Sequence, residues 1–259
     1  MTRRAGARCA AAALAGLAAA AWPGRGAPAQ DMRWAPPSAL RPGIGSEDPR
    51  RPVDPAQGDP WRALGRVQTE IGGRCTGVLV GSRTVLTAAH CLIARRAESM
   101  LQPGSVHFLL GYHLGRYAAH ARVVAYATGP GFRPSPMGPA GADWALLTLD
   151  QPIGRDGLAL PLLREPPAPR TPLMLAGYQK DRPEALLADT ACRALGLERR
   201  ESGHPMLVHD CAGTQGVSGA PVLARGPDGR WGVAGVASLT ARDIALGHAV
   251  PAASVGPVP

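Results

Sequence analysis

The chain contains few aromatic side chains, a single lysine and no apolar run long enough to span a membrane. Phe, Tyr and Trp together make up 4% of its 259 residues, too few to serve as stacking platforms between the basic residues of a nucleic-acid-binding surface. The formal net charge of +9 is carried by arginines scattered along the chain. These features argue against a nucleic-acid partner and favour a mildly basic, solvated surface.

The first 29 residues have the pattern of a secretory signal peptide. Arginines at positions 3, 4 and 8 precede an apolar run over residues 10–21, and residues 27–29 (Ala-Pro-Ala) form a small-residue cleavage site. We expect cleavage after Ala29, export to the periplasm or the medium, and no membrane anchor on the mature chain. The twin arginine near the start leaves twin-arginine export open, although apolar residues do not follow it directly.

Removal of the signal peptide leaves an even set of four cysteines: Cys75, Cys91, Cys192 and Cys211. We expect Cys75 to pair with Cys91 and Cys192 with Cys211, because each pair closes a local loop and exported proteins meet an oxidising compartment. A zinc site that adds His90 and His209 is the alternative, but neither C-x-x-C nor H-x-x-x-H spacing occurs. Three further histidines have a spacing typical of exposed strand positions: His107, His113 and His120. We therefore expect no metal and no cofactor.

The chain divides into a proline-rich start and a region of short strands. Residues 30–60 hold seven prolines and few apolar side chains, which predicts an extended arm or a propeptide. From Trp61 on, short apolar runs are separated by Gly, Pro and Asp, as is typical of strands. No segment keeps a helical period for long, although residues 182–195 are consistent with one short helix. The expected strands cover residues 76–80, 84–86, 106–112, 122–127, 144–149, 173–178, 206–209, 221–224, 231–239 and 248–250.

This pattern of about a dozen short strands, divided near residues 161–172 by a proline-rich connection, predicts an all-β fold of two small barrels or a sandwich. We expect one domain over residues 61–259. Its first barrel would span about residues 61–155 and its second about residues 170–255.

Three short segments supply the groups of nucleophilic acyl transfer. His90 lies in residues 86–91 (Leu-Thr-Ala-Ala-His-Cys), Asp143 starts the expected strand 144–149, and Ser218 lies in residues 213–221 (Gly-Thr-Gln-Gly-Val-Ser-Gly-Ala-Pro). A serine hydroxyl is inert at neutral pH until a base takes its proton, and a carboxylate orients that base. We therefore expect Ser218 as the nucleophile, His90 as the general base and Asp143 as the carboxylate that orients His90.

The sequence around these residues favours the same roles. A disulfide at Cys91 would fix the turn that carries the imidazole, and Asp143 can be buried at the mouth of an apolar strand. Asp150, at the far end of that strand, is the rival carboxylate. Glycines around Ser218 allow a tight turn in which the amides of Gly216 and Ser218 point at one spot and form an oxyanion hole. Because the histidine and the serine belong to different halves, the halves must face each other across a cleft.

These segments resemble those of the trypsin/chymotrypsin-like serine peptidase family, most closely its bacterial secreted, glutamyl-endopeptidase-like branch. Residues 87–91, 143–147 and 216–221 resemble the family's histidine, aspartate and serine boxes, in the chain order that chymotrypsin-type enzymes use. Residues 235–238 resemble the later strand whose serine, here Ser238, supports the catalytic aspartate and whose backbone pairs with the substrate. The resemblance covers roughly residue 61 to the C-terminus. It implies two six-stranded antiparallel β-barrels, chymotrypsin-like, with the active site in the cleft between them.

Some positions depart from the patterns of well-known family members. Val217 stands where trypsin-type enzymes have an aspartate that pairs with a freshly cut N-terminus, so activation of that kind is not expected. Ala212 replaces the aspartate that selects Arg or Lys, and Ala237 falls where glutamyl endopeptidases have a glutamate-binding histidine. A substrate pocket lined by Ala212, Gly213 and Thr240 would suit a small or apolar side chain.

The sequence therefore predicts a secreted, monomeric serine endopeptidase that cleaves polypeptides through an acyl-enzyme on Ser218. The alternative is a catalytically weak protease-like module that binds peptides or envelope components, motivated by the departures around Val217 and Ala220. Fluorophosphonate labelling separates the two, because such a probe modifies only an activated serine.

Overall fold

The computed structural model describes residues 42–259 except residues 156 and 200–202. The expected signal peptide and the first part of the expected arm lie outside the described residues. The described part consists of strands and short 3-10 turns joined by loops. None of its helices is long and apolar enough to cross a membrane.

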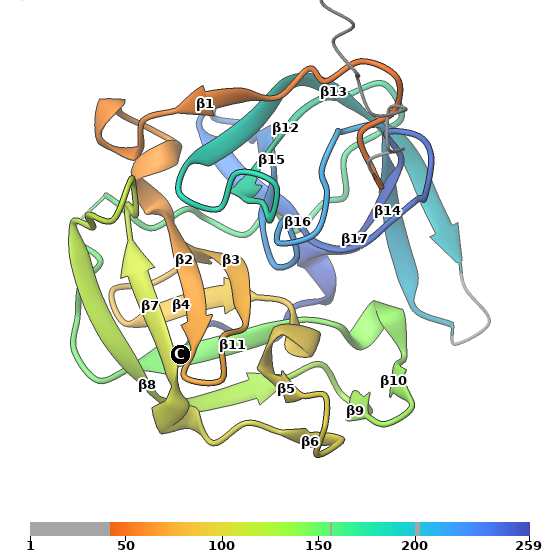
Figure 1. Ribbon diagram of the computed structural model, residues 1–259. Coiled ribbons are helices and arrows are strands. Elements are labelled where there is room, and N and C mark those ends of the chain that lie inside the picture. The colour runs from red at the N-terminus through yellow and green to blue at the C-terminus, as the bar shows by residue number, and fades with distance from the viewer. Residues whose placement is uncertain (1–41, 156, 200–202) are drawn as a thin grey trace, which may run out of the picture. The chain divides into compact units, whose positions relative to one another are not determined.

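The first barrel is a closed antiparallel ring of six strands with the spatial order β11-β4-β3-β2-β7-β8 (Figure 1). Its strands are β2 (Leu64–Thr69), β3 (Arg74–Leu79), β4 (Thr84–Thr87), β7 (Val106–Leu110), β8 (Ala119–Thr128) and β11 (Ala145–Leu149). In β7, Val106, Phe108 and Leu110 are buried and alternate with half-buried residues, the period of two that a strand imposes. Because β11 pairs with both β4 and β8, the ring has no unpaired edge.

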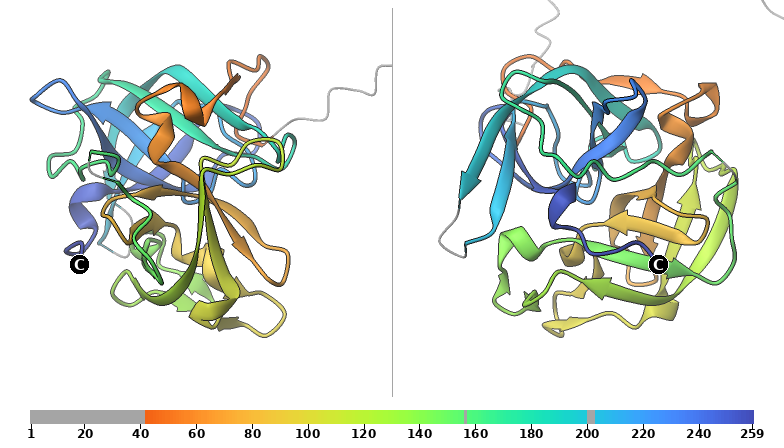
Figure 2. Two further views of the ribbon diagram at one scale, coloured as in Figure 1. Left: turned by 90° about the vertical axis from the view of Figure 1, so that its left-hand side faces the viewer. Right: turned by 180° about the vertical axis from the view of Figure 1, so that it is seen from behind.

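The second barrel is also a closed antiparallel ring of six strands, with the order β13-β12-β15-β16-β17-β14 and a further pairing of β13 with β14. Its strands are β12 (Pro172–Tyr178), β13 (Leu186–Arg199), β14 (Pro205–His209), β15 (Pro221–Arg225), β16 (Trp231–Thr240) and β17 (Gly247–Pro251). The expectation of two six-stranded antiparallel barrels is confirmed. The C-terminal residues return to the first barrel (Figure 2). There Thr84 Oγ1 donates to a backbone oxygen of Pro259 over 3.3 Å.

The helix expected over residues 182–195 is wrong, because strand β13 occupies most of that range. Alanine and leucine favour a helix locally, but here the backbone is paired on both sides. Leu186 to Ala188 lie between β12 and the short strand β1 (Arg51–Val53), and all three side chains are buried. Pairing across the sheet thus outweighs the local helical preference.

Residues 43–53 lie against the second barrel, where the carbonyl of Gly43 accepts the amide of Gly213 and β1 pairs with β13. After β1 come the 3-10 turns η1 (Pro55–Gln57) and η2 (Trp61–Ala63), which lead into the first barrel. Arg50, directly before β1, is 2% exposed. Part of the stretch for which we expected an extended arm is therefore folded, whereas the domain boundary at residue 61 and a propeptide role stay predictions.

The remaining short elements lie in the connections between the strands of the two barrels or after the last strand. They are the hairpins β5 (Ile93–Ala94) with β6 (Ser99–Met100) and β9 (Arg133–Pro134) with β10 (Met137–Gly138), and the 3-10 turns η3 (Ala89–Leu92), η4 (Pro103–Ser105), η5 (Ala140–Ala142) and η6 (Ala252–Ser254). Turns η3 and η5 matter for function, because they carry the expected histidine and precede the expected aspartate.

Candidate active site

His90 lies in the 3-10 turn η3, which begins two residues after the buried strand β4. The next residue, Cys91, forms a disulfide with Cys75 on β3, with an S–S distance of 2.04 Å. The turn is therefore anchored by a strand at its start and by a covalent bond beside the imidazole. The His90 side chain keeps 11% of its surface exposed, so one side of the ring is accessible.

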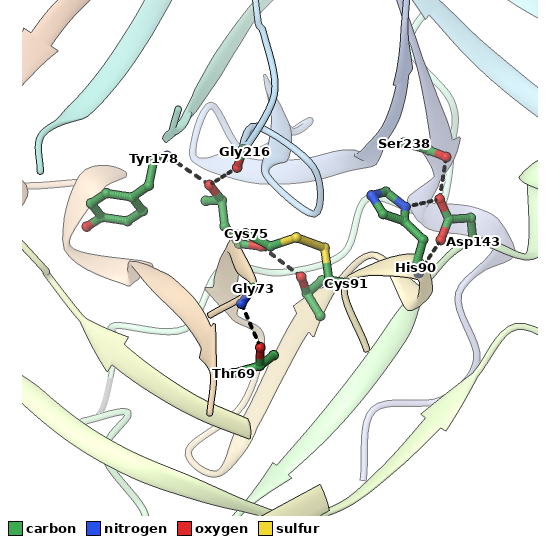
Figure 3. The surroundings of a disulfide bond; sticks show 11 residues. Thr69, Gly73, Cys75, His90, Cys91, Asp143, Tyr178, Gly216 and Ser238 are labelled. Atoms are coloured by element: carbon green, nitrogen blue, oxygen red, sulfur yellow. Dashed lines mark hydrogen bonds and ion pairs between the residues drawn. A yellow bond between two sulfur atoms is a disulfide. The ribbon is translucent and has the colours of Figure 1, made fainter. Parts of the chain in front are cut away.

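Asp143 directly follows turn η5, and both of its carboxylate oxygens contact His90 (Figure 3). Oδ1 accepts the backbone amide of His90 over 2.8 Å, and Oδ2 lies 2.6 Å from the ring Nδ1. This double contact fixes both the position of the histidine backbone and the plane of its ring. Asp150 instead accepts the backbone amide of Arg122 at the surface. The structure thus brings Asp143, and not Asp150, to His90.

Ser238 extends this chain of hydrogen bonds into the second barrel. It lies in β16, and its Oγ donates to Asp143 Oδ2 over 2.5 Å, as Figure 3 shows. Burial by itself raises the pKa of Asp143, but the hydrogen bonds and charge of His90, together with the bond from Ser238, outweigh burial and hold this pKa below its ordinary value. Asp143 is therefore an anion, which is the form that stabilises a protonated imidazole.

Ser218 lies in a turn that requires glycine on either side. Gly216 and Gly219 have φ angles of +95° and +78°, in the region that residues with a Cβ rarely adopt. A Cβ at Gly219 would also overlap Oγ1 of Thr87, so the turn lies directly against the end of β4, three residues before His90. The glycines thus let the serine of the second barrel approach the histidine of the first.

The amides of Gly216 and Ser218, both half-buried residues, have no acceptor within the described part of the chain, and neither has that of the exposed Gln215. The amide of Val217, between Gly216 and Ser218, donates to the carbonyl of Thr214 over 3.0 Å and closes the turn. Among the described residues no hydrogen bond joins Ser218 Oγ to the histidine ring. Catalytic hydrogen bonds are often long before substrate binds and tighten in the complex.

Thr76 joins the serine turn to the first barrel. Its Oγ1 donates to the carbonyl of Gly216 over 3.1 Å and accepts the amide of Tyr178 over 2.8 Å. Its amide donates to the carbonyl of Ser218 over 3.0 Å, and its carbonyl accepts Thr87 Oγ1 over 2.7 Å. Sequence reasoning did not single out this residue, although its place directly after Cys75 was a usable signal. One threonine thus fixes two carbonyls of the turn that carries the serine.

The residues expected to line a substrate pocket lie close to this turn. Ala212 is fully buried, and its amide donates to Oδ2 of Asp189 over 2.9 Å. The amide of Gly213 donates to the carbonyl of Gly43 over 2.8 Å, while Thr240 is exposed at the end of β16. Asp189 is 3% exposed and also accepts the amide of Ala191, and the sequence analysis missed it. The available signal was the carboxylate directly after the apolar run of residues 186–188. A carboxylate that is buried with such a run needs hydrogen-bond partners, which would have pointed to a structural role.

The four cysteines of the described residues form two disulfides, which bears on the zinc site that the sequence left as an alternative. Two clusters of possible ligands occur in the described part, Cys75–His90–Cys91 and Cys192–Asp210–Cys211. Each contains a disulfide, so its sulfurs are not thiolates. His107 Nδ1 lies 3.0 Å from His120 Nε2 on the face of β7 and β8, and His209 is buried in β14. The disulfides have the pairing that the sequence favoured.

Two closed barrels, with a His–Asp pair on the first and a glycine-flanked serine on the second, are the arrangement of a chymotrypsin-like serine protease. The family model described as "Trypsin-like peptidase domain" matches residues 75–236, from the first disulfide to β16. The chain therefore belongs to the trypsin-like peptidase family.

Curated relatives share part of their length with this chain. It is 33% identical to "Serine protease 56" of Mus musculus over 199 residues, which are 66% of this chain and 30% of that protein. It is 34% identical to "Complement C1r subcomponent-like protein" of Homo sapiens over 110 residues, which are 40% of this chain and 21% of that protein. The chain thus spans less than a third of the length of these relatives.

A solved structure, "Structure of Glu endopeptidase in complex with MPD", has the same fold. The match has a TM-score of 0.67 at 16% sequence identity and covers 81% of this chain and 93% of that chain. At this identity the likeness establishes the double-barrel fold.

Proposed function

We propose that this protein is a secreted serine endopeptidase with Ser218, His90 and Asp143 as its catalytic triad. The observation that carries the proposal is the 2.6 Å contact between His90 Nδ1 and Asp143 Oδ2, beside a glycine-flanked serine that packs on the strand leading to the histidine. Because Asp143 holds Nδ1, the other ring nitrogen, Nε2, is the one that takes the proton of the nucleophile.

The reaction proceeds through an acyl-enzyme in two steps. Ser218 Oγ attacks the scissile carbonyl while His90 Nε2 accepts the hydroxyl proton, and His90 then gives this proton to the leaving amine. Water attacks the acyl-enzyme in the second step, with His90 again acting first as base and then as acid. Asp143 stays ionised throughout and stabilises the imidazolium of His90.

The amides of Gly216 and Ser218 stabilise the oxyanion of each tetrahedral intermediate. Their lack of a partner among the described residues supports this role, since an amide already bonded within the chain would have to break that bond first. One such donor contributes about 3 kcal/mol to the stabilisation of the transition state. Thr76 supports the arrangement, because it holds the carbonyls on both sides of this turn.

The substrate is a polypeptide, as for the peptidase family. We propose a small or apolar side chain at the cleavage site, from a pocket bounded by Ala212, Gly213 and Thr240. Export through the N-terminal 29 residues agrees with the two disulfides, which form in oxidising compartments. We also propose that the chain acts as a monomer.

Hydrolysis of an unfolded protein and of a peptide library by the mature chain tests this function. We expect the wild-type protein to cleave both, and Ser218→Ala and His90→Ala to lose activity. Ser105→Ala is the matched control, since its hydroxyl bonds to the carbonyl of Gln102 on the surface of the first barrel. Absence of cleavage by the folded wild type, or full activity of Ser218→Ala, would refute the proposal and favour a binding module.

A further inference from the structure

Arg50 is the bulkiest fully buried side chain of the described residues, and its charge is completely partnered. Nε donates to Asp48 Oδ1 (2.9 Å), and Nη2 donates to Asp48 Oδ2 (2.9 Å) and Asp181 Oδ2 (2.6 Å). Nη1 donates to Gln179 Oε1 (2.5 Å) and Asp181 Oδ1 (3.2 Å). A guanidinium has five N–H groups in a rigid plane, so these bonds fix its position in every direction.

Gln179 connects the guanidinium of Arg50 to the loop that carries the nucleophile. It is fully buried at the end of β12, and the same Oε1 that binds the guanidinium also accepts the amide of Thr214 over 2.8 Å. Thr214 in turn closes the serine turn, because its carbonyl accepts the amide of Val217. Two hydrogen bonds, both to Gln179 Oε1, therefore connect the guanidinium to the backbone of the nucleophile loop.

The segment before β1 and the end of β12 hold the same loop by its backbone. The carbonyl of Gly43 accepts the amide of Gly213 over 2.8 Å, and the amide of Lys180 donates to the carbonyl of Gln215 over 2.6 Å. A Cβ at Gly43 would overlap the carbonyl of Gly213, so the two backbones are in direct contact. No side chain of residues 213–220 is charged, and Val217, next to the serine, packs in the apolar core of the second barrel. An ion pair made by the loop itself therefore does not hold it in place.

We propose that Arg50 is a positioning residue for the nucleophile loop, acting through Gln179 on the amide of Thr214. The ion pairs with Asp48 and Asp181 hold the guanidinium, and the guanidinium orients the glutamine oxygen that anchors the loop. This inference rests on the proposed function. It assigns to residues 43–50, which the sequence suggested to be an arm, a structural part in the enzyme that maturation must leave in place.

The test compares two substitutions of Gln179 in the mature chain. Gln179→Leu removes the shared acceptor, whereas Gln179→Glu keeps an oxygen for both the guanidinium and the amide of Thr214. Arg50→Met removes the charge. Arg83→Met is the control for loss of an arginine elsewhere, because Arg83 is exposed and makes three hydrogen bonds to the carbonyls of Leu149 and Asp150 at the end of β11. The readouts are kcat and KM with a peptide substrate, the unfolding midpoint, and hydrogen exchange of residues 213–220 by mass spectrometry.

We expect Gln179→Leu and Arg50→Met to lower kcat by at least about tenfold with KM nearly unchanged, because displacement of the reacting groups weakens transition-state more than ground-state binding. Exchange of residues 213–220 should become faster. Gln179→Glu should keep kcat and the exchange of residues 213–220 close to those of the wild type. Arg83→Met should lower the unfolding midpoint and leave kcat unchanged.

Wild-type kcat together with unchanged exchange in Gln179→Leu would overturn the inference, as would an equal loss of kcat in Arg83→Met. If Arg50→Met does not fold, the comparison of Gln179→Leu with Gln179→Glu still tests whether Gln179 positions the nucleophile loop. Inactivity of the folded wild type would refute the proposed function instead, and the exchange measurement would still show whether the loop is held.

Discussion

Replacement of Thr76 by valine tests how much the Oγ1 atom of this residue, which joins the two barrels by hydrogen bonds, contributes to stability and catalysis. Valine has the shape of threonine, so Thr76→Val keeps the packing of β3 and removes only the hydroxyl that bonds to Gly216 and Tyr178. The amide of Tyr178 is then buried without an acceptor, which costs about 1–3 kcal/mol, and the lost bond to Gly216 adds about 1 kcal/mol. We expect the free energy of unfolding to fall by about 2–4 kcal/mol.

The same substitution should also lower kcat, because the carbonyl of Gly216 belongs to the turn that aims the oxyanion-hole amides. Urea unfolding gives the stability change, and initial rates with a peptide substrate give kcat. Thr76→Ser is the control, since it keeps the hydroxyl and loses one methyl group. Equal effects of Thr76→Val and Thr76→Ser on kcat would contradict this role of the hydroxyl, because the loss would then come from packing and not from the hydrogen bonds.

Three further predictions follow from neighbouring contacts. Ser238→Ala should raise the pKa of Asp143, because the hydrogen bond from Ser238 favours the ionised carboxylate. We expect the acidic limb of kcat/KM to move to higher pH and kcat/KM to fall about tenfold. An unchanged pH–rate profile would contradict a role of this contact in catalysis. Burial lowers the pKa of His209 to about 4, so the unfolded chain binds one more proton than the native state between pH 6.5 and pH 4. Stability should therefore fall by about 2–3 kcal/mol on going from pH 7.5 to pH 4.5, and His209→Leu should abolish this part of the decrease in urea titrations. Removal of the Cys75–Cys91 disulfide by a double alanine variant should cost about 3 kcal/mol and also lower kcat, since it releases the turn of His90. The Cys192–Cys211 double variant should lose comparable stability with a smaller loss of kcat.

The elements that sequence reasoning identified are those with a local signature. Strands such as β7 and β11 are short apolar runs between turn residues, and they lie within a few residues of their expected positions. The histidine, aspartate and serine were likewise found from short strings of neighbours. The structure places the histidine and aspartate in contact and packs the serine turn against the strand that leads to the histidine.

What the sequence did not reveal depends on contacts between distant residues. Strand β2 is absent from the expected strands. It contains Arg66, which is 6% exposed, stacks over the ring of Tyr112 at 3.5 Å and pairs with Glu184. Arg50 and Gln179 are 129 residues apart, and no local pattern connects them. A charged side chain can be buried where a partner comes from another part of the chain, and only the fold supplies that partner.

The catalytic triad is tested by labelling with a fluorophosphonate probe, followed by identification of the modified residue by mass spectrometry. We expect stoichiometric modification of Ser218 in the folded mature protein, strong slowing of labelling in Asp143→Asn and no labelling in Ser218→Ala. Absence of labelling in the folded wild-type protein, or modification of a different serine, would contradict the assignment of Ser218, His90 and Asp143 as a catalytic triad.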